Sequence, residues 1–134
     1  MENILISVKE VCKQIPKYNC NLIVEGAGGL LVPLNKNEFV IDLIKELNAK
    51  VVLVSSGYLG SINHSLLTAE VCSKHQLNVA GWVFNDCLRL YEEQIVEWSG
   101  FPKIFSLPKT EMVNKAFVRS LAEEHRQTIK TLLC

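Results

Sequence analysis

The chain has 134 residues, of which 49% are hydrophobic and 21% charged, with zero formal net charge and a mean hydropathy of +0.18. This size fits a single domain, residues 1–134, with a real core, and the balanced charge without a basic run argues against a nucleic-acid or anionic-membrane surface. No apolar stretch approaches the roughly 18 residues of a membrane span, and the N-terminus shows no signal-peptide pattern.

Hydrophobic periodicity predicts helices alternating with short buried strands. In chain order the predicted elements are a helix over 4–15 that stops at Pro16, a strand over 21–25, a helix over 39–47, a strand over 50–54, a helix over 62–72, a strand over 79–84, a helix over 90–98, a strand over 103–107 and a final helix over 111–133. This alternation implies βαβ units, so we expect an α/β fold with a parallel sheet. Because the strands are continuously apolar, we expect helices on both faces of that sheet.

The cysteines and histidines are scattered through the chain. The five cysteines are Cys12, Cys20, Cys72, Cys87 and Cys134. No pair has the spacing of a metal-binding or redox motif, and no spacing joins His64, His75 and His125 into a zinc site. This pattern favours structural or solvent-facing roles in a reducing compartment, and therefore a cytoplasmic location.

Three of the predicted strands end in unusual sequence, and ligands of open parallel sheets bind at the carboxyl ends of strands. The first end is Glu25, followed by Gly26, Ala27, Gly28 and Gly29. A carboxylate there is suited to Mg²⁺, and the glycines allow the backbone to approach a phosphate or substrate. A tight turn beside an ordinary exposed acid explains these residues equally well.

The second strand is followed by a helix start, and the third strand ends in a polar residue. Glycines lead into Ser61, Ile62 and Asn63, where a helix N-terminus with Ser61 as its cap suits an anion. Asn85 can both donate and accept hydrogen bonds, which matches the edge of an adenine. The alternatives are that Ser61 only caps its helix and that Asn85 forms an Asx turn, which spacing alone favours.

Taken together, four motifs resemble the dethiobiotin synthetase family over about residues 20–110. They are Val-Glu-Gly-Ala-Gly-Gly at 24–29, Pro-Leu at 33–34, Leu-Gly-Ser-Ile-Asn-His at 59–64 and Ala-Gly-Trp-Val-Phe-Asn-Asp at 80–86. The resemblance implies a P-loop NTPase-like fold and a homodimeric enzyme of biotin synthesis. Members of this family join CO2 to 7,8-diaminononanoate with ATP and Mg²⁺. The reaction passes through a carbamate and a mixed carbamic-phosphoric anhydride, which closes to the ureido ring.

The resemblance also implies a role for each matching residue. Glu25 would bind Mg²⁺, and the loop at 26–29 would lie beside the substrate and the transferring phosphate. The backbone at 61–63 would bind the substrate carboxylate across the dimer interface; the family often has Cys at position 61, a mild departure because the backbone makes the contact. The nucleotide contacts implied by the resemblance are Glu25, Gly28, Asn85, Asp86 and Pro108.

One family motif is missing from the 134 residues. No Gly-x-x-x-x-Gly-Lys-Ser/Thr loop occurs in them, and neither does the region that supplies further lysines and a second Mg²⁺-binding acid. Phosphoryl transfer depends on positioning and on neutralising the phosphate charge. We therefore expect the chain to be inactive without an N-terminal half, and to have an unpaired apolar sheet edge. The alternatives are a non-catalytic α/β binding module and a fragment of a related ATP-dependent amidoligase, which shares Glu-Gly-Ala-Gly.

Overall fold

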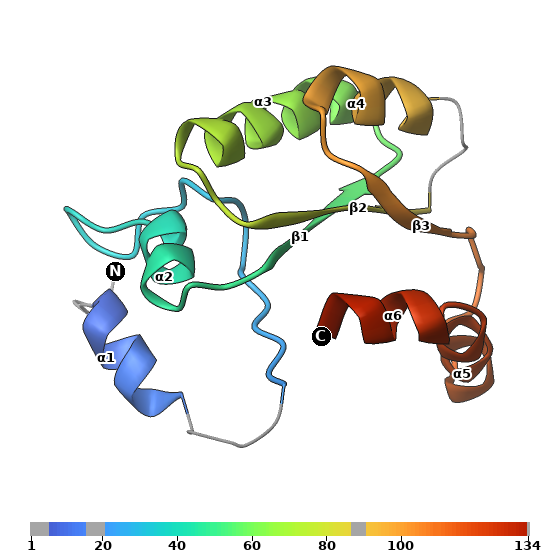
Figure 1. Cartoon of the computed structure of the whole chain (residues 1–134), viewed down its shortest axis with the longest axis horizontal. Helices are drawn as coiled ribbons and strands as arrows, with labels where there is room; N and C mark the ends of the chain where they lie inside the picture. The colour runs from blue at the N-terminus through green and yellow to red at the C-terminus, as the bar shows by residue number, and fades with distance from the viewer. Residues whose placement is uncertain (1–5, 16–20, 87–90, 134) are drawn as a thin grey trace. The chain divides into compact units, whose positions relative to one another are not determined.

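A computed structural model describes residues 6–15, 21–86 and 91–133. The chain forms two compact units, residues 1–49 and 50–134 (Figure 1). The first unit contains α1 (Val8–Gln14) and α2 (Val40–Glu46). The second contains β1 (Val51–Ser56), α3 (Ser61–Lys74), β2 (Val79–Asn85), α4 (Glu92–Ser99), β3 (Lys103–Leu107), α5 (Lys115–Glu124) and α6 (Arg126–Leu133). None of the helices within these ranges has the length and apolar character needed to span a bilayer.

The second unit is built on a parallel sheet in the order β1-β2-β3. β2 is central: Val54 pairs with Val83 on one side, and Val83 pairs with Phe105 on the other. A helix connects each pair of adjacent parallel strands: α3 connects β1 to β2, and α4 connects β2 to β3. The α/β fold with a parallel sheet, predicted from the alternating pattern, is confirmed.

One face of this sheet carries the main core. Figure 1 shows α3 and α4 lying together over it. The side chains that point there are fully buried or nearly so: Leu53, Ser55, Trp82 and Phe84. Polar atoms in this layer are paired, because the Ser55 and Ser65 hydroxyls lie 2.9 Å apart and the Trp82 indole donates to Ser99 Oγ at 2.9 Å.

A partly buried ion pair links α4 to β3. Glu92, the first residue of α4, is buried, and one of its carboxylate oxygens accepts from Lys103 Nζ at 2.8 Å and from Ser106 Oγ at 2.6 Å. A carboxylate in the first turn also interacts favourably with the positive end of the helix dipole. The sequence connecting β2 to β3 is thereby anchored at both ends of α4, since Trp82 bonds to Ser99.

The opposite face is covered unevenly. The Phe105 ring of β3 stacks on His125 at a centroid distance of 4.3 Å, and Lys50 Nζ donates to the Leu132 carbonyl, so α5 and α6 lie against this face. On β1, however, Val52 and Val54 remain 42% and 66% exposed. Helices thus lie on both faces of the sheet, as predicted, although Val52 and Val54 of β1 stay partly open to solvent.

Two predicted elements differ from the structure. Residues 21–25 form no strand: they are irregular and exposed, because no other described segment pairs with their backbone groups. The final helix is broken at His125 into α5 and α6. A straight helix over 111–133 would be about 35 Å long, roughly twice the length of a five-residue strand, so an unbroken helix would extend well past the sheet.

The remaining boundaries agree within a few residues of those predicted. Several sequence-based predictions concern positions outside the described residues, and these are residues 4–5, Pro16, residue 90, Cys20, Cys87 and Cys134.

Candidate functional site

The acid-and-glycine segment lies in the first unit and is open to solvent. Residues 25–29 are all exposed, and within the described ranges the Glu25 carboxylate has neither a hydrogen bond nor an ion pair. Likewise, no three His, Cys, Asp or Glu side chains of the described residues come together as a metal cluster. A single free carboxylate fits a Mg²⁺ ion held chiefly by water and phosphate oxygens, which is how this ion usually binds.

The turn that leads into α2 determines the backbone conformation of the glycines. Gly28 has φ +81, a conformation that favours glycine, and a Cβ there would lie 2.7 Å from a methyl group of Val32. A side chain on Gly26 would meet Val40, the first residue of α2. Backbone bonds from Val32 to Gly29 and from Ile41 to Leu30 fix this approach. The segment therefore runs past the N-terminal end of α2 with its backbone accessible.

The helix start at residues 61–63 differs in one detail from the prediction. Gly60, with φ +95, takes the cap position, so Ser61 is the first helical residue and not the cap. The reason is a turn in which the Ser61 N–H donates to the Tyr58 carbonyl at 3.0 Å. The N–H groups of Ile62 and Asn63 have no acceptor among the described residues. Two free N–H groups at a helix N-terminus are suited to a carboxylate or phosphate.

The predicted base-binding residues come together at one cavity. Asn85 ends β2, Asp86 follows it with φ +56, and Pro108 follows β3; all three line a cavity of about 500 Å³ in the second unit. The Asp86 N–H donates to Leu107 at 3.3 Å, and its carboxylate lies 3.7 Å from Lys109 Nζ. The pairing of β2 with β3 is what places residues so far apart in sequence on one cavity.

The walls of this cavity come from α5, α6 and the segment before them. Five apolar residues from the segment predicted as the final helix line it: Val113, Phe117, Val118, Leu121 and Ile129. Phe105 and His125, which are not among the predicted site residues, also line it. The two rings stack on each other although they are twenty positions apart in sequence. No sequence spacing rule predicts such a contact.

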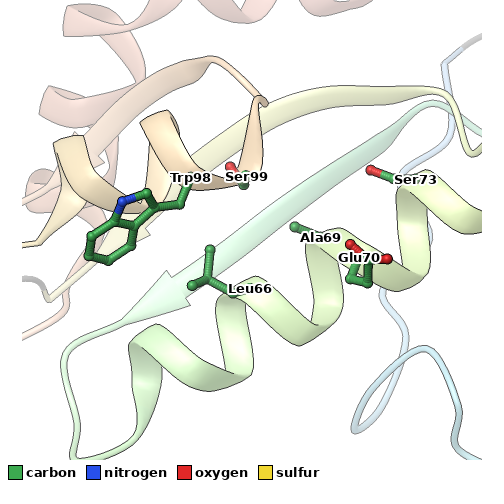
Figure 2. Close-up of a pocket in the computed structure, with 6 residues that line it drawn as sticks. All are labelled: Leu66, Ala69, Glu70, Ser73, Trp98 and Ser99. Atoms are coloured by element: carbon green, nitrogen blue, oxygen red, sulfur yellow. The ribbon is translucent and has the colours of Figure 1, made fainter.

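A second hollow lies on the other side of the sheet. It has about 160 Å³ and lies between α3 and α4, with Leu66, Ala69 and Glu70 on one side and Trp98 on the other (Figure 2). None of the predicted site residues lines it. The larger cavity is therefore the candidate site of the second unit.

The family of the chain follows from its motifs and from comparison with known proteins. A family model described as an AAA domain matches residues 1–116, and the chain belongs to this family. Its relatives include proteins named ATP-dependent dethiobiotin synthetase, as the motifs at 24–29, 59–64 and 80–86 predict. The resemblance inferred from the sequence is thus confirmed.

Sequence identity and coverage are given for three of these relatives. The one from Cytophaga hutchinsonii is 43% identical over 111 residues, 81% of this chain and 54% of that protein. The one from Chlamydia pneumoniae is 32% identical over 127 residues, 95% of this chain and 57% of that protein. The one from Sulfurovum sp. is 50% identical over 72 residues, 54% of this chain and 32% of that protein. The chain thus spans about half the length of the curated relatives it matches.

Proposed function

We propose that this chain supplies the substrate and base-binding side of a cytoplasmic, homodimeric dethiobiotin synthase, which uses ATP and Mg²⁺ to join CO2 to 7,8-diaminononanoate. The observation that carries the proposal is the 43% identity to a dethiobiotin synthetase over 111 residues, which is 81% of this chain. The proposal treats residues 1–134 as part of one catalytic domain whose phosphate loop comes from an N-terminal half.

Glu25 and the glycine segment are assigned to the phosphate and metal side. A carboxylate without a protein partner is free to join a Mg²⁺ ion whose other ligands are phosphate oxygens and water. The exposed backbone at Gly26, Ala27, Gly28 and Gly29 leaves room for the substrate and for the transferring phosphate. The metal would neutralise charge on the phosphates during transfer.

Ser61, Ile62 and Asn63 are assigned to the substrate carboxylate, in a contact that crosses the dimer. The unpaired N–H groups of Ile62 and Asn63 support this assignment, because they provide donors and a partial positive charge at the same place. The Ser61 N–H is already bonded to Tyr58, so the contact falls to the next two residues.

Asn85, Asp86 and Pro108 are assigned to the nucleotide. Their common cavity of about 500 Å³ lies within the range of small-molecule sites and combines apolar walls with polar groups at one end. The Asn85 amide offers a donor and an acceptor to the base edge. Asp86, which is paired with Lys109, contributes its backbone and carboxylate at the same end.

The test is complementation of activity in vitro. The 134-residue chain is assayed with 7,8-diaminononanoate, bicarbonate and MgATP, alone and together with the P-loop half of the Cytophaga hutchinsonii relative. We expect no turnover alone and measurable dethiobiotin formation with the added half. Glu25→Gln should then reduce the rate about 10²-fold or more, whereas Glu46→Gln, an exposed acid of α2 in the same unit, should leave the rate unchanged.

A second candidate function is a binding module without catalysis, favoured by the lack of a Gly-Lys-Thr loop in the 134 residues. The same experiment separates the two. Activity that never appears with the P-loop half, combined with retained binding of 7,8-diaminononanoate, supports the binding module. Full turnover by the chain alone contradicts the proposed division of the site.

A further inference from the structure

Helix α5 has an apolar side that the protein itself does not bury. All ten residues of α5 lie in the described part of the chain, and none of them is buried. Among these ten, only Phe117 and Leu121, which are one turn apart on the same side, are even partly covered. An amphipathic helix is normally stabilised by packing its apolar side against a core. Here that side borders the cavity of about 500 Å³, which is therefore suited to an apolar group of a ligand.

Two phenylalanine rings line the cavity, and they differ in what they already contact. Phe105 stacks on His125, with ring centroids 4.3 Å apart and an interplanar angle of 9°. Phe117 stacks on no other ring of the described residues. Its backbone is nevertheless fixed, because the Phe117 N–H donates to Oδ1 of Asn114, the N-cap of α5, at 3.0 Å. A ring without an aromatic partner, on an anchored turn, is suited to stack on a flat ligand.

The same cavity contains Asn85 and Pro108, which are assigned above to the nucleotide. We propose that the ring of Phe117 stacks on a purine base bound there, and so holds the base while the Asn85 amide contacts its edge. Stacking uses the face of a base and tolerates changes at its edge, so Phe117 supplies affinity and Asn85 supplies discrimination. This role of Phe117 rests on the proposed assignment of the cavity to the nucleotide. Phe117 lies beyond residues 1–116, the part that the family model matches, so the family assignment gives it no role.

Adenosine and inosine are the probes for this contact. They share a purine face and a ribose but differ at the base edge, and neither carries the phosphates whose binding loop is missing from the 134 residues. Their affinities for the 134-residue chain are measured by calorimetry or ligand-detected NMR. Phe117→Leu keeps an apolar side chain and removes the ring, so it should weaken both nucleosides by the same factor, about tenfold. Phe117→Tyr keeps a ring and should bind both within about twofold of the unaltered chain.

Phe101→Leu is the matched control for the loss of a ring. Phe101 precedes β3, at the other end of that strand from Pro108, and does not line the cavity. Both affinities should therefore be unchanged in this variant. Asn85→Ala should instead change the ratio of the two affinities, because the amide contacts the edge at which adenosine and inosine differ.

The outcomes separate the role of Phe117 from the function of the cavity. Unchanged nucleoside affinity in Phe117→Leu overturns the stacking role but leaves the assignment of Asn85 and Pro108 in place. Equal weakening in Phe117→Leu and Phe117→Tyr, with a lowered thermal midpoint in both, shows a ring needed only for packing and also overturns the stacking role. Failure of adenosine to bind the unaltered chain overturns both the role of Phe117 and the nucleotide assignment of the cavity.

Discussion

Residues 22–25 and 82–85 are similar in sequence pattern and opposite in structure. Each has three large apolar residues followed by a polar residue predicted for the site, Glu25 in one and Asn85 in the other. In the first, Leu22, Ile23 and Val24 are irregular and at least half exposed. In the second, the three residues are buried in β2, which has β1 on one edge and β3 on the other. An apolar run becomes a strand only where its backbone groups find partners.

This contrast separates the two sides of the proposed site. Asn85 is held at the end of a strand bonded on both edges, and the cavity beside it exists in the free chain. Glu25 has no such support within the described residues. Preorganised groups stabilise a transition state much better than loose ones. On the proposed assignment, the nucleotide side is therefore preformed, whereas the metal side would need a partner segment that orders residues 21–29.

The largest expected effect comes from comparing a buried aromatic residue of β2 with an exposed apolar residue of the irregular segment. Phe84→Ala removes a fully buried ring stacked near Trp82 and should lower the free energy of unfolding by about 4 kcal/mol. Ile23→Ala changes a side chain that is 87% exposed and should have an effect below about 0.5 kcal/mol. Urea unfolding followed by circular dichroism measures both.

The change in the free energy of unfolding caused by Ile23→Ala is the more informative of the two measurements. A loss of 2 kcal/mol or more in Ile23→Ala would mean that residues 22–24 are packed in the free chain, contrary to the structure. The comparison can also be extended by repeating Ile23→Ala in the presence of the P-loop half. If that half orders the segment as a strand, the same substitution becomes destabilising there.

A smaller effect is expected from a pair of glycines, one in each region. Gly81 in β2 has φ +142, and a Cβ there would lie 2.3 Å from the Pro102 carbonyl oxygen, which already accepts from the Trp82 N–H. Gly81→Ala should therefore cost about 3 kcal/mol. Gly29 has no atom within 4 Å of its Cβ position, so Gly29→Ala should be neutral or slightly stabilising. If Gly81→Ala and Gly29→Ala changed the free energy of unfolding equally, the two segments would not differ in packing as the structure indicates.

The sequence was sufficient for elements whose partners are close along the chain. The alternation from residue 39 to residue 107 predicted α2, β1, α3, β2, α4 and β3 with nearly correct bounds, because each βαβ unit forms from neighbouring segments. The pattern failed for residues 21–25, which are apolar but find no pairing strand among the residues that the structure describes. It also missed the break at His125, which depends on the length of the sheet face and on the stack with Phe105. Long-range packing of this kind leaves no periodic signal.

The smallest predicted effect concerns the two cysteines within the described residues. Cys72 on α3 is fully buried, and this burial raises the pKa of its thiol from 9.0 to about 11, whereas Cys12 on α1 is only partly covered. Because the thiolate is the reactive form, iodoacetamide at pH 8 should modify Cys12 well before Cys72, as resolved by peptide mass spectrometry. A folded-state pKa above the unfolded value stabilises the protein below pH 9, and this contribution is lost as the pH rises towards 11. Cys72→Ala should therefore flatten the fall in stability over that interval. Equal modification rates in the native protein would mean that the layer between α3 and the sheet opens as readily as the first unit.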